Sequence, residues 1–250
     1  MIEMRKILTN LSKNFPKRLA KKYHDHVGIM TGKMPGKVQK IFLCLDLDWE
    51  VFPEVLKAKP DVVMTHHPFI YGTKASVFKW DLSKKELSDK MDELGIPVYS
   101  FHTNFDEGKG GINDALSAAL GLENVYSNPI EPMMRIGYLP EEMDVNDFAR
   151  YAKERLNVSY GLLVNYGKEK VKKVGIVGGA GSRDFPKAIL EGCDIYISGD
   201  APHYVRRDVI NRKFNYLDLP HEIEKVFMQA MKNILLSIDS SLDIITVDHE

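Results

Sequence analysis

A chain of 250 residues and 28.5 kDa is long enough for one large or two medium-sized domains and needs neither disulfides nor a metal merely to fold. Its 34 basic and 35 acidic residues give a net charge of −1. With a pI near 6.7, this balance argues against a dedicated nucleic-acid-binding protein, which usually has a basic excess. Apolar residues make up 44% and charged residues 28%, an ordinary composition for a soluble globular protein and unlike that of a disordered chain.

The cysteines and the apolar runs argue against a secreted or membrane protein. Cys44 and Cys193 lie in separate apolar stretches and are expected to be reduced, buried thiols, because a disulfide framework needs more cysteines. The longest apolar run, residues 41–45, is far shorter than the roughly 20 residues of a membrane span. The amino terminus is charged throughout and lacks the apolar core of a signal peptide. We therefore predict a cytoplasmic protein without a membrane partner.

In chain order, the first 120 residues alternate between predicted helices and strands. Residues 2–11 carry apolar side chains at helical spacing, and Pro16 marks a break or a fresh helix start. The segment Ser83–Glu86 (SKKE) fits a capping box that begins a strong helix, and Gly95 fits its end. The other helices are expected at residues 49–59 and 112–120, and the strands at residues 38–45, 61–64 and 97–101.

The second half of the chain shows the same alternation, and Asn128–Pro132 (NPIEP) is the best candidate for a domain boundary. Helices are expected at residues 144–156, 202–212 and 221–236, and strands at residues 133–139, 160–165, 171–177, 195–197, 214–217 and 242–247. Strand and helix alternating twice predict an α/β protein, a two-domain layered unit with mixed, partly parallel sheets.

Three of the eight histidines follow predicted strands directly. His66 and His67 lie in THHPFIYG, and His102 begins HTNFDEG, which also contains Asp106. The carboxyl ends of strands in an α/β sheet are where ligand sites form, so these side chains are expected to share a polar pocket. Adjacent strand residues point to opposite faces, and Pro68 favours the bend that would let the two neighbouring imidazoles converge. A single histidine is more often an ordinary core or surface residue, but imidazole and carboxylate together suit Zn, Fe, Mn or Ni.

The segment LPHEIEKVF adds two further donors. His221 and Glu224 are three residues apart at a predicted helix start, so their side chains can lie on one face. Such a pair is common in any charged helix and is weak evidence alone. With the earlier groups, however, it supplies enough donors for two ions.

These segments, in this order, resemble the GTP cyclohydrolase type 2 homologue family, also called the NIF-three-like family, over essentially the whole chain. The family's His-His-Pro motif matches His66–Pro68, and its His-Thr-Asn-x-Asp motif matches His102–Asp106 in full. Its terminal Gly-His-x-x-Glu-Lys motif looks like Pro220–Lys225. Its early Asp-Asn-x-Gly segment looks like Asp25–Gly28, and its strand followed by Leu-Asp looks like Leu45–Asp46.

The resemblance implies a dinuclear metal centre with two divalent ions per chain, of unknown identity among Zn, Fe, Mn and Ni. The implied ligands are His66, His67, Asp106, His221 and Glu224. His102, outside that ligand set, is expected to act in catalysis as an outer partner or a proton shuttle. The resemblance further implies a metal-binding α/β domain of residues 1–128 plus 219–250, a smaller α/β domain of residues 129–218, and a homohexameric ring.

The function expected from this centre is metal-dependent hydrolysis of a small molecule, and the family name suggests GTP. The alternative is a non-catalytic metal-binding scaffold or a regulatory interaction protein. Departures from the family pattern occur at His26, Pro220 and Tyr204, where the family usually has Asn, Gly and His.

Two other motifs have competing interpretations. The segment IFLCLDLDWEV resembles the nucleophile motif of haloacid-dehalogenase phosphatases, but Glu50 stands where that family has Thr. We expect instead that Asp46 ends a strand near the metal pocket and that Asp48 begins the following helix. The run Gly178–Ser182 lacks the lysine of a P-loop, so it does not predict a P-loop. It is either a tight turn or a place where backbone N–H groups contact an anion.

Overall fold

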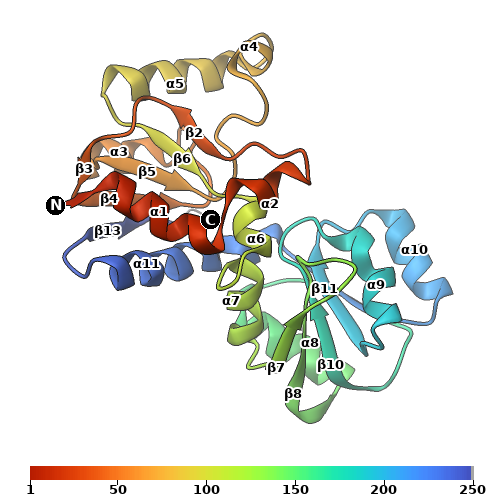
Figure 1. Ribbon diagram of the computed structural model, residues 1–250. Coiled ribbons are helices and arrows are strands. Elements are labelled where there is room, and N and C mark those ends of the chain that lie inside the picture. The colour runs from red at the N-terminus through yellow and green to blue at the C-terminus, as the bar shows by residue number, and fades with distance from the viewer. Residues whose placement is uncertain (249–250) are drawn as a thin grey trace. The chain divides into compact units, whose positions relative to one another are not determined.

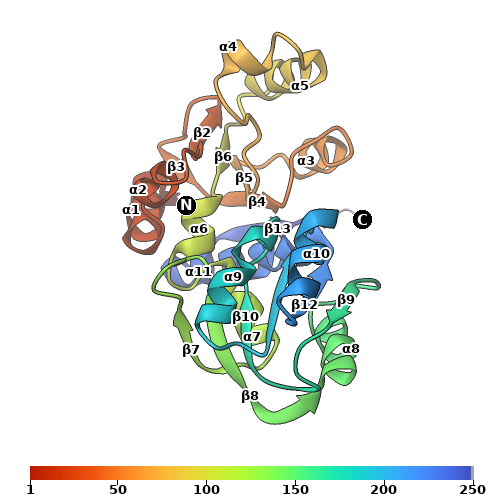
Figure 2. The same cartoon turned by 90° about the vertical axis from the view of Figure 1, so that its right-hand side faces the viewer.

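The computed structural model describes residues 1–248, which form two compact units. One unit comprises Met1–Gly111 and the segment from Phe227 onward, and the other comprises Ile112–Val226. Each contains a mixed sheet with helices on both faces, which confirms the predicted α/β class (Figures 1 and 2). Helix α7 (Ile112–Ala119) contacts strands of the second unit, so residues 112–128 fall there. The domain limits drawn at residues 128 and 219 stay a prediction.

The first unit is built on a five-stranded sheet with the strand order β13-β4-β5-β6-β2. The first four strands run parallel, and β2 pairs with β6 in the antiparallel sense at one edge. The strands are β2 (Gly28–Thr31), β4 (Lys40–Cys44), β5 (Val62–Thr65), β6 (Val98–Ser100) and β13 (Asp243–Thr246), with a separate pair of β1 (Ile2–Glu3) and β3 (Lys37–Val38). The helices are α1 (Met4–Asn14), α2 (Lys17–Lys21), α3 (Phe52–Ala58), α4 (Lys74–Val77), α5 (Leu82–Glu93), α6 (Thr103–Glu107) and α11 (Val226–Ile238).

Both faces of this sheet are buried, as parallel sheets require. On one face, Phe42 and Val63 pack in a core with residues of α3 and α5. On the other, Leu43 and Met64 are fully buried, because alternate strand residues point to opposite sides. Helices α1 and α3 flank the sheet from opposite sides in Figure 2. Cys44 lies inside the first core, makes no disulfide as expected, and burial raises the pKa of its thiol.

Helix α5 begins earlier than its sequence predicts. The predicted capping box at Ser83 is wrong: the N-cap is Asp81, whose carboxylate accepts a hydrogen bond from Lys84 N (2.8 Å). The Ser83 hydroxyl instead accepts a hydrogen bond from the Trp49 indole N–H at 2.8 Å. An aspartate two residues upstream satisfies a free backbone N–H equally well, so the helix begins there although Lys84 stands where a capping box has Glu or Gln.

We expect Asp81→Ala to lower the free energy of unfolding by about 1 kcal/mol, because the first turn of α5 loses its cap. Ser83→Ala is the matched control and is expected to have a smaller effect, since the bond to Trp49 is exposed. Urea unfolding of both variants checks this. A larger loss for Ser83→Ala would contradict the assignment of Asp81 as the cap.

The second unit contains a six-stranded sheet with the order β7-β8-β10-β11-β12-β9, in which β10, β11 and β12 are parallel. Helices α9 and α10 contribute to a core on one face, and α7 and α8 contact the strands from the other. The strands are β7 (Glu123–Ser127), β8 (Arg135–Asp144), β9 (Leu162–Asn165), β10 (Lys170–Ile176), β11 (Ile195–Gly199) and β12 (Asn215–Leu219). The further helices are α8 (Val145–Arg155), α9 (Phe185–Leu190) and α10 (His203–Asn211).

Some elements differ from the prediction. The helix expected at residues 221–236 is divided into a 3₁₀-helix, His221–Lys225, and α11; such tight turns are frequent at helix starts. Strands β2 and β7 and helices α4 and α6 were not predicted, because each has five residues or fewer and carries too little periodic signal. None of the helices in residues 1–248 is long and apolar enough to cross a membrane.

Asp194 links the starts of β10 and β11. Its carboxylate accepts hydrogen bonds from the backbone N–H groups of Lys172 (3.0 Å) and Lys173 (2.8 Å) and from the Lys168 ammonium (2.5 Å). Burial by itself raises the pKa of Asp194, but these hydrogen bonds outweigh it and hold the pKa below the ordinary value of 3.8.

A carboxyl group whose pKa is lower in the folded protein stabilises the fold above its ordinary pKa, and this contribution is lost as the pH falls below it. We therefore expect the free energy of unfolding of the wild type to fall more steeply between about pH 4 and about pH 2 than that of Asp194→Asn. Urea unfolding across this range measures the difference. If the free energy of unfolding fell equally steeply with pH in the two proteins, Asp194 would make no such contribution to stability.

Candidate metal centre

In the first unit, the parallel strands β4, β5 and β6 end at the same edge of the sheet, where the chain turns sharply after β5. The hydroxyl of Thr65 donates to the carbonyl of His67 (2.7 Å) and pairs with the hydroxyl of Ser100 at 2.7 Å. His67 N donates in turn to the carbonyl of Leu45 at 3.0 Å. These bonds fix the bend that two adjacent histidines need in order to face the same region.

Three imidazoles converge at this edge. The ring centroids of His66 and His67 lie 4.9 Å apart, and that of His102 lies 5.2 Å from His66 and 5.8 Å from His67. One ring nitrogen from each lies within 4.8 Å of the others, a spacing that suits a common metal ion. Since neutral imidazole is a preferred ligand of Zn, Fe and Ni, the donor chemistry fits a divalent transition metal.

Two of these imidazoles are oriented by carboxylates through their Nδ1 atoms. Asp46 Oδ2 lies 2.8 Å from Nδ1 of His67, and Asp25 Oδ2 lies 2.6 Å from Nδ1 of His102. Metal-binding histidines generally have one ring nitrogen held in this way, which directs the other nitrogen, Nε2, toward the metal and raises its basicity. The bond from Asp46 also agrees with the prediction that this residue ends a strand near the pocket, rather than serving as a phosphatase nucleophile.

The charge state of Asp25 suits this role. Burial alone would raise the pKa of Asp25, but hydrogen bonds from His102 and from the hydroxyl (2.7 Å) and N–H (3.3 Å) of Thr103 outweigh it and lower the pKa to about 2. The carboxylate is therefore ionised at neutral pH. It can hold the His102 ring in one orientation and stabilise its protonated form.

Asp106 lies on the short helix α6, which begins directly after His102. Its Oδ1 atom lies 3.5 Å from Nε2 of His66, and both side chains are buried, with His66 fully so. The centroid of the His66 ring lies 5.4 Å from that of Phe227. A carboxylate against a buried imidazole matches a mixed His/Asp donor set.

In the second unit, parallel strands β11 and β12 also end side by side in the sheet. Asp200 follows β11, and His221 follows β12 after Pro220. Asp200 Oδ2 lies 2.7 Å from Nδ1 of His221, and Glu224 Oε2 lies 3.0 Å from Nε2. In a 3₁₀-helix, side chains three apart are eclipsed, so the predicted pairing of His221 with Glu224 is realised here by a tighter helix than expected.

The glycine run after β10 forms the tight turn that was one of its two interpretations. Gly179 has a φ of +58°, and its carbonyl accepts bonds from Gly199 N (2.7 Å) and the Ser198 hydroxyl (3.0 Å). A Cβ at Gly179 would overlap the carboxylate of Glu224 and lie 3.1 Å from Nε2 of His221. The absence of a side chain thus leaves room beside these two donor atoms.

A cavity of about 540 Å³ adjoins His221 within the second unit. Its wall includes Tyr160, whose side chain is exposed, and an ion pair between Arg206 and Asp218 (3.5 Å). An aromatic face, a cation and carboxylates beside a metal-ligand candidate can together hold a small polar molecule.

Of the residues predicted for the site, the first unit brings together His66, His67, His102 and Asp106, and the second brings together His221 and Glu224. Sequence analysis did not assign a role to Asp25 or Asp200 and gave Asp46 none beyond its position. For Asp46 and Asp200 the available signal was their position shortly after a predicted strand, and for Asp25 it was the likeness of Asp25–Gly28 to the family's early segment. The partner histidine of each lies 21 or more residues away.

The chain was compared with known proteins. The Duf34/NIF3 (NGG1p interacting factor 3) family model matches residues 2–250. A GTP cyclohydrolase 1 type 2 homolog of Clostridium perfringens is 31% identical over 231 residues, which cover 88% of this chain and 87% of that protein. The protein of the same name from Lactococcus lactis is 29% identical over 238 residues, covering 92% and 90%.

Solved structures agree on the fold. A Bacillus cereus protein related to NIF3 superimposes with a TM-score of 0.88 at 23% identity, covering 99% of this chain and 97% of that one. The match across almost the whole chain confirms the resemblance drawn from the motifs: this chain belongs to the Duf34/NIF3 (NGG1p interacting factor 3) family.

Proposed function

We propose that this protein is a metal-dependent hydrolase with a dinuclear centre held by His66, His67, Asp106, His221 and Glu224. The observation that carries the proposal is the carboxylate on Nδ1 of His67, His102 and His221. Surface histidines do not need such partners, whereas metal ligands generally have them. The matched motifs support treating these five residues as one ligand set.

A bound pair of divalent ions (Zn, Fe, Mn or Ni) supplies Lewis acidity and makes water a nucleophile near neutral pH. The residues of the chain do the rest. Asp46 and Asp200 fix the rings of His67 and His221. His102, held by ionised Asp25, is placed to accept or return a proton at Nε2. Its place among the three imidazoles makes it a further candidate ligand as well.

For the substrate we propose a purine nucleotide, with GTP first among those to test. The relatives' printed name, GTP cyclohydrolase 1 type 2 homolog, points to it. The cavity beside His221 offers Tyr160 for stacking on a base and Arg206 for a phosphate or carbonyl oxygen. A small molecule held there would be adjacent to one of the proposed ligands.

The test is turnover by metal-loaded protein incubated with GTP, with formate and pterin product as readouts. Wild type and His203→Ala, an exposed histidine that belongs neither to the cavity lining nor to the donor groups, should behave alike, and His67→Ala should be inactive. Metal binding without turnover of GTP or of other phosphoester and amide substrates would contradict the hydrolase proposal. It would favour a metal-binding scaffold, in keeping with the interaction partner in the family's name.

Asp46→Asn is expected to weaken metal binding about 10–100-fold, because a neutral amide orients the His67 ring less well and lowers its basicity. Asp48→Asn is the control, since among residues 1–248 the Asp48 carboxylate accepts backbone hydrogen bonds from Glu50 and Val51 (both 2.9 Å) in the turn before α3. The expectation that Asp48 begins this helix is wrong, because α3 begins at Phe52 with Val51 as its N-cap. Competition with a metal-binding dye measures both. Equal metal affinities of Asp46→Asn and Asp48→Asn would show that Asp46 does not support a metal ligand.

We further propose, from the family resemblance, that the protein assembles as a homohexameric ring. Light scattering of the purified protein should then give about six times the chain mass of 28.5 kDa. A monomer would contradict the ring.

A further inference from the structure

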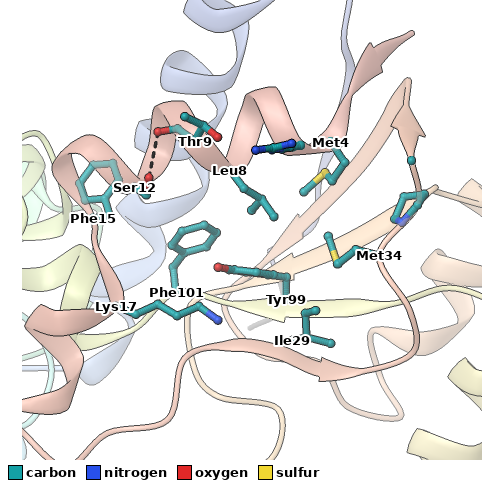
Figure 3. A pocket seen from close by; sticks show the side chains of 13 residues that line it. Met4, Leu8, Thr9, Ser12, Phe15, Lys17, Ile29, Met34, Tyr99 and Phe101 are labelled. Carbon is teal, nitrogen blue, oxygen red and sulfur yellow. Dashed lines mark hydrogen bonds between the residues drawn. The ribbon is translucent and has the colours of Figure 1, made fainter.

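A second cavity lies in the first unit, between α1 and the strands β2 and β6, and it includes none of the residues of the candidate metal centre. Its volume is about 560 Å³. Helix α1 forms one wall, the loop before β3 forms another, and the side chains of Tyr99 and Phe101 form the floor (Figure 3). We call it the α1 pocket; the residues that carry its chemistry are Arg5, Leu8, Lys17, Met34, Tyr99 and Phe101.

The interior of the α1 pocket is apolar and open to solvent. The rings of Tyr99 and Phe101 lie 4.9 Å apart, and Figure 3 shows Leu8 and Met34 pointing toward them. Ile29 on the edge strand β2 is 53% exposed at the margin. Flat aromatic and flexible aliphatic side chains around one space favour a ligand with a flat apolar body.

The charged residues that line the pocket are all basic. Lys17 and Arg5 both line the pocket, and the lining contains no acidic residue. The Lys17 ammonium lies 5.6 Å from the centre of the Tyr99 ring. Gly28 leaves room for this ammonium, because a Cβ at position 28 would overlap it. Neither cation forms a salt bridge with any residue among 1–248. Two cations without a counter-charge at an apolar cavity are complementary to an anion.

The floor adds a hydrogen-bond donor. Tyr99 is only 8% exposed, yet its hydroxyl makes no hydrogen bond within the described chain. The hydroxyl oxygen does not belong to the buried polar atoms that lack a partner among residues 1–248, so it is accessible and can donate to a ligand. Burial also raises the pKa of Tyr99, so the hydroxyl keeps its proton. Figure 3 shows this oxygen within the pocket, where a ligand can accept the bond.

We propose that the α1 pocket binds a small amphipathic anion: a flat apolar body over Tyr99 and Phe101 and an acidic group that is held by Lys17 and Arg5. The inference is independent of the hydrolase proposal. A second copy of the chain is the other occupant that an exposed apolar groove can have. The unbalanced cations favour the small anion, because a protein surface covering the groove would have to neutralise both of them.

The test uses two fluorescent probes that share one ring system. 1-Anilinonaphthalene-8-sulfonate carries an acidic group, and N-phenyl-1-naphthylamine lacks it. Titration of the folded full-length protein should show saturable binding of about one sulfonate probe per chain, tighter than binding of the neutral probe. Lys17→Gln and Arg5→Gln should each weaken the sulfonate probe by about fivefold, the effect of one ion pair at an exposed margin, and leave the neutral probe unchanged.

Two further variants separate this pocket from unspecific binding. No described atom lies within 4 Å of a Cβ added at Gly36, another lining residue, so Gly36→Leu is expected to fill the space without disturbing the fold and to abolish binding of both probes. Lys33→Gln, an exposed lysine outside the lining, should change nothing. His67→Ala should also bind as wild type does.

Equal binding of the two probes, or sulfonate binding that survives Gly36→Leu, would overturn the proposal. So would binding that appears only after the assembly is diluted to single chains, since the groove would then be an interface between copies. Circular dichroism and thermal unfolding of each variant confirm that a lost signal is not a lost fold.

Discussion

Replacing His67 by alanine is expected to lower the metal content of the purified protein from the two divalent ions per chain of the proposed centre to one or none. The substitution removes an imidazole whose Nδ1 is already fixed by Asp46, so the lost contribution is that of a pre-oriented ligand. The affinity should fall by more than the roughly 10–100-fold that the loss of an outer partner causes. Elemental analysis of freshly purified protein gives the ratio of ions to chains.

His67 is better suited to this experiment than His66, because its side chain is 21% exposed whereas that of His66 is fully buried. Truncation at position 66 would also leave a cavity in the fold. His203→Ala is the matched control and should retain both ions. If His67→Ala retained both ions as well, the proposed centre would be wrong, whatever the activity of the variant.

The second large effect is expected at Gly179, a residue with no functional group. Gly179→Ala places a Cβ against the Glu224 carboxylate and close to Nε2 of His221, so both donors must move away from the geometry in which we propose that they hold an ion. We expect loss of the ion bound by this pair and loss of any turnover. The left-handed backbone adds a destabilisation of about 1 kcal/mol.

Gly192→Ala separates these two effects. Gly192 has a φ of +72°, and nothing lies within 4 Å of a Cβ built there. It therefore carries the backbone penalty alone. Calorimetric metal titration of the two variants should show wild-type stoichiometry for Gly192→Ala and a missing site for Gly179→Ala. Identical titrations would mean that the glycine serves only the turn.

The sequence predicts the sheets of this protein well, because their strands are buried and the alternation of strand and helix is regular. Residues 38–45 and 195–197 are predicted as strands from composition alone; the first range contains β4 and the second lies in β11, and both strands belong to the parallel part of a sheet. Val38, at the start of the first range, lies instead in β3, which pairs antiparallel with β1. Short edge elements such as β2 and β7 escaped, since pairing with a neighbour rather than local pattern makes them strands.

In the candidate site, too, some residues could be predicted from the sequence and others could not. His66, His67, His102 and Asp106 could be grouped from the sequence because strand ends converge in any parallel sheet. The carboxylates that orient the imidazoles could not, since contacts such as that between Asp25 and His102 join distant segments. Sequence spacing also could not separate Asp81 from Ser83 as the start of α5, because backbone geometry decides between them.

The inserted position of the second unit constrains how the chain is made. Strand β13, in the last part of the chain, pairs with β4, whose residues are synthesised about 200 positions earlier. On the ribosome, the whole of Ile112–Val226 emerges before that pairing can form. Until then, the edge of β4 that later pairs with β13 stays unpaired. Exposed strand edges recruit other chains. We therefore expect nascent copies that stall before residue 243 to aggregate more readily than the full-length chain, even though they already contain every proposed metal ligand.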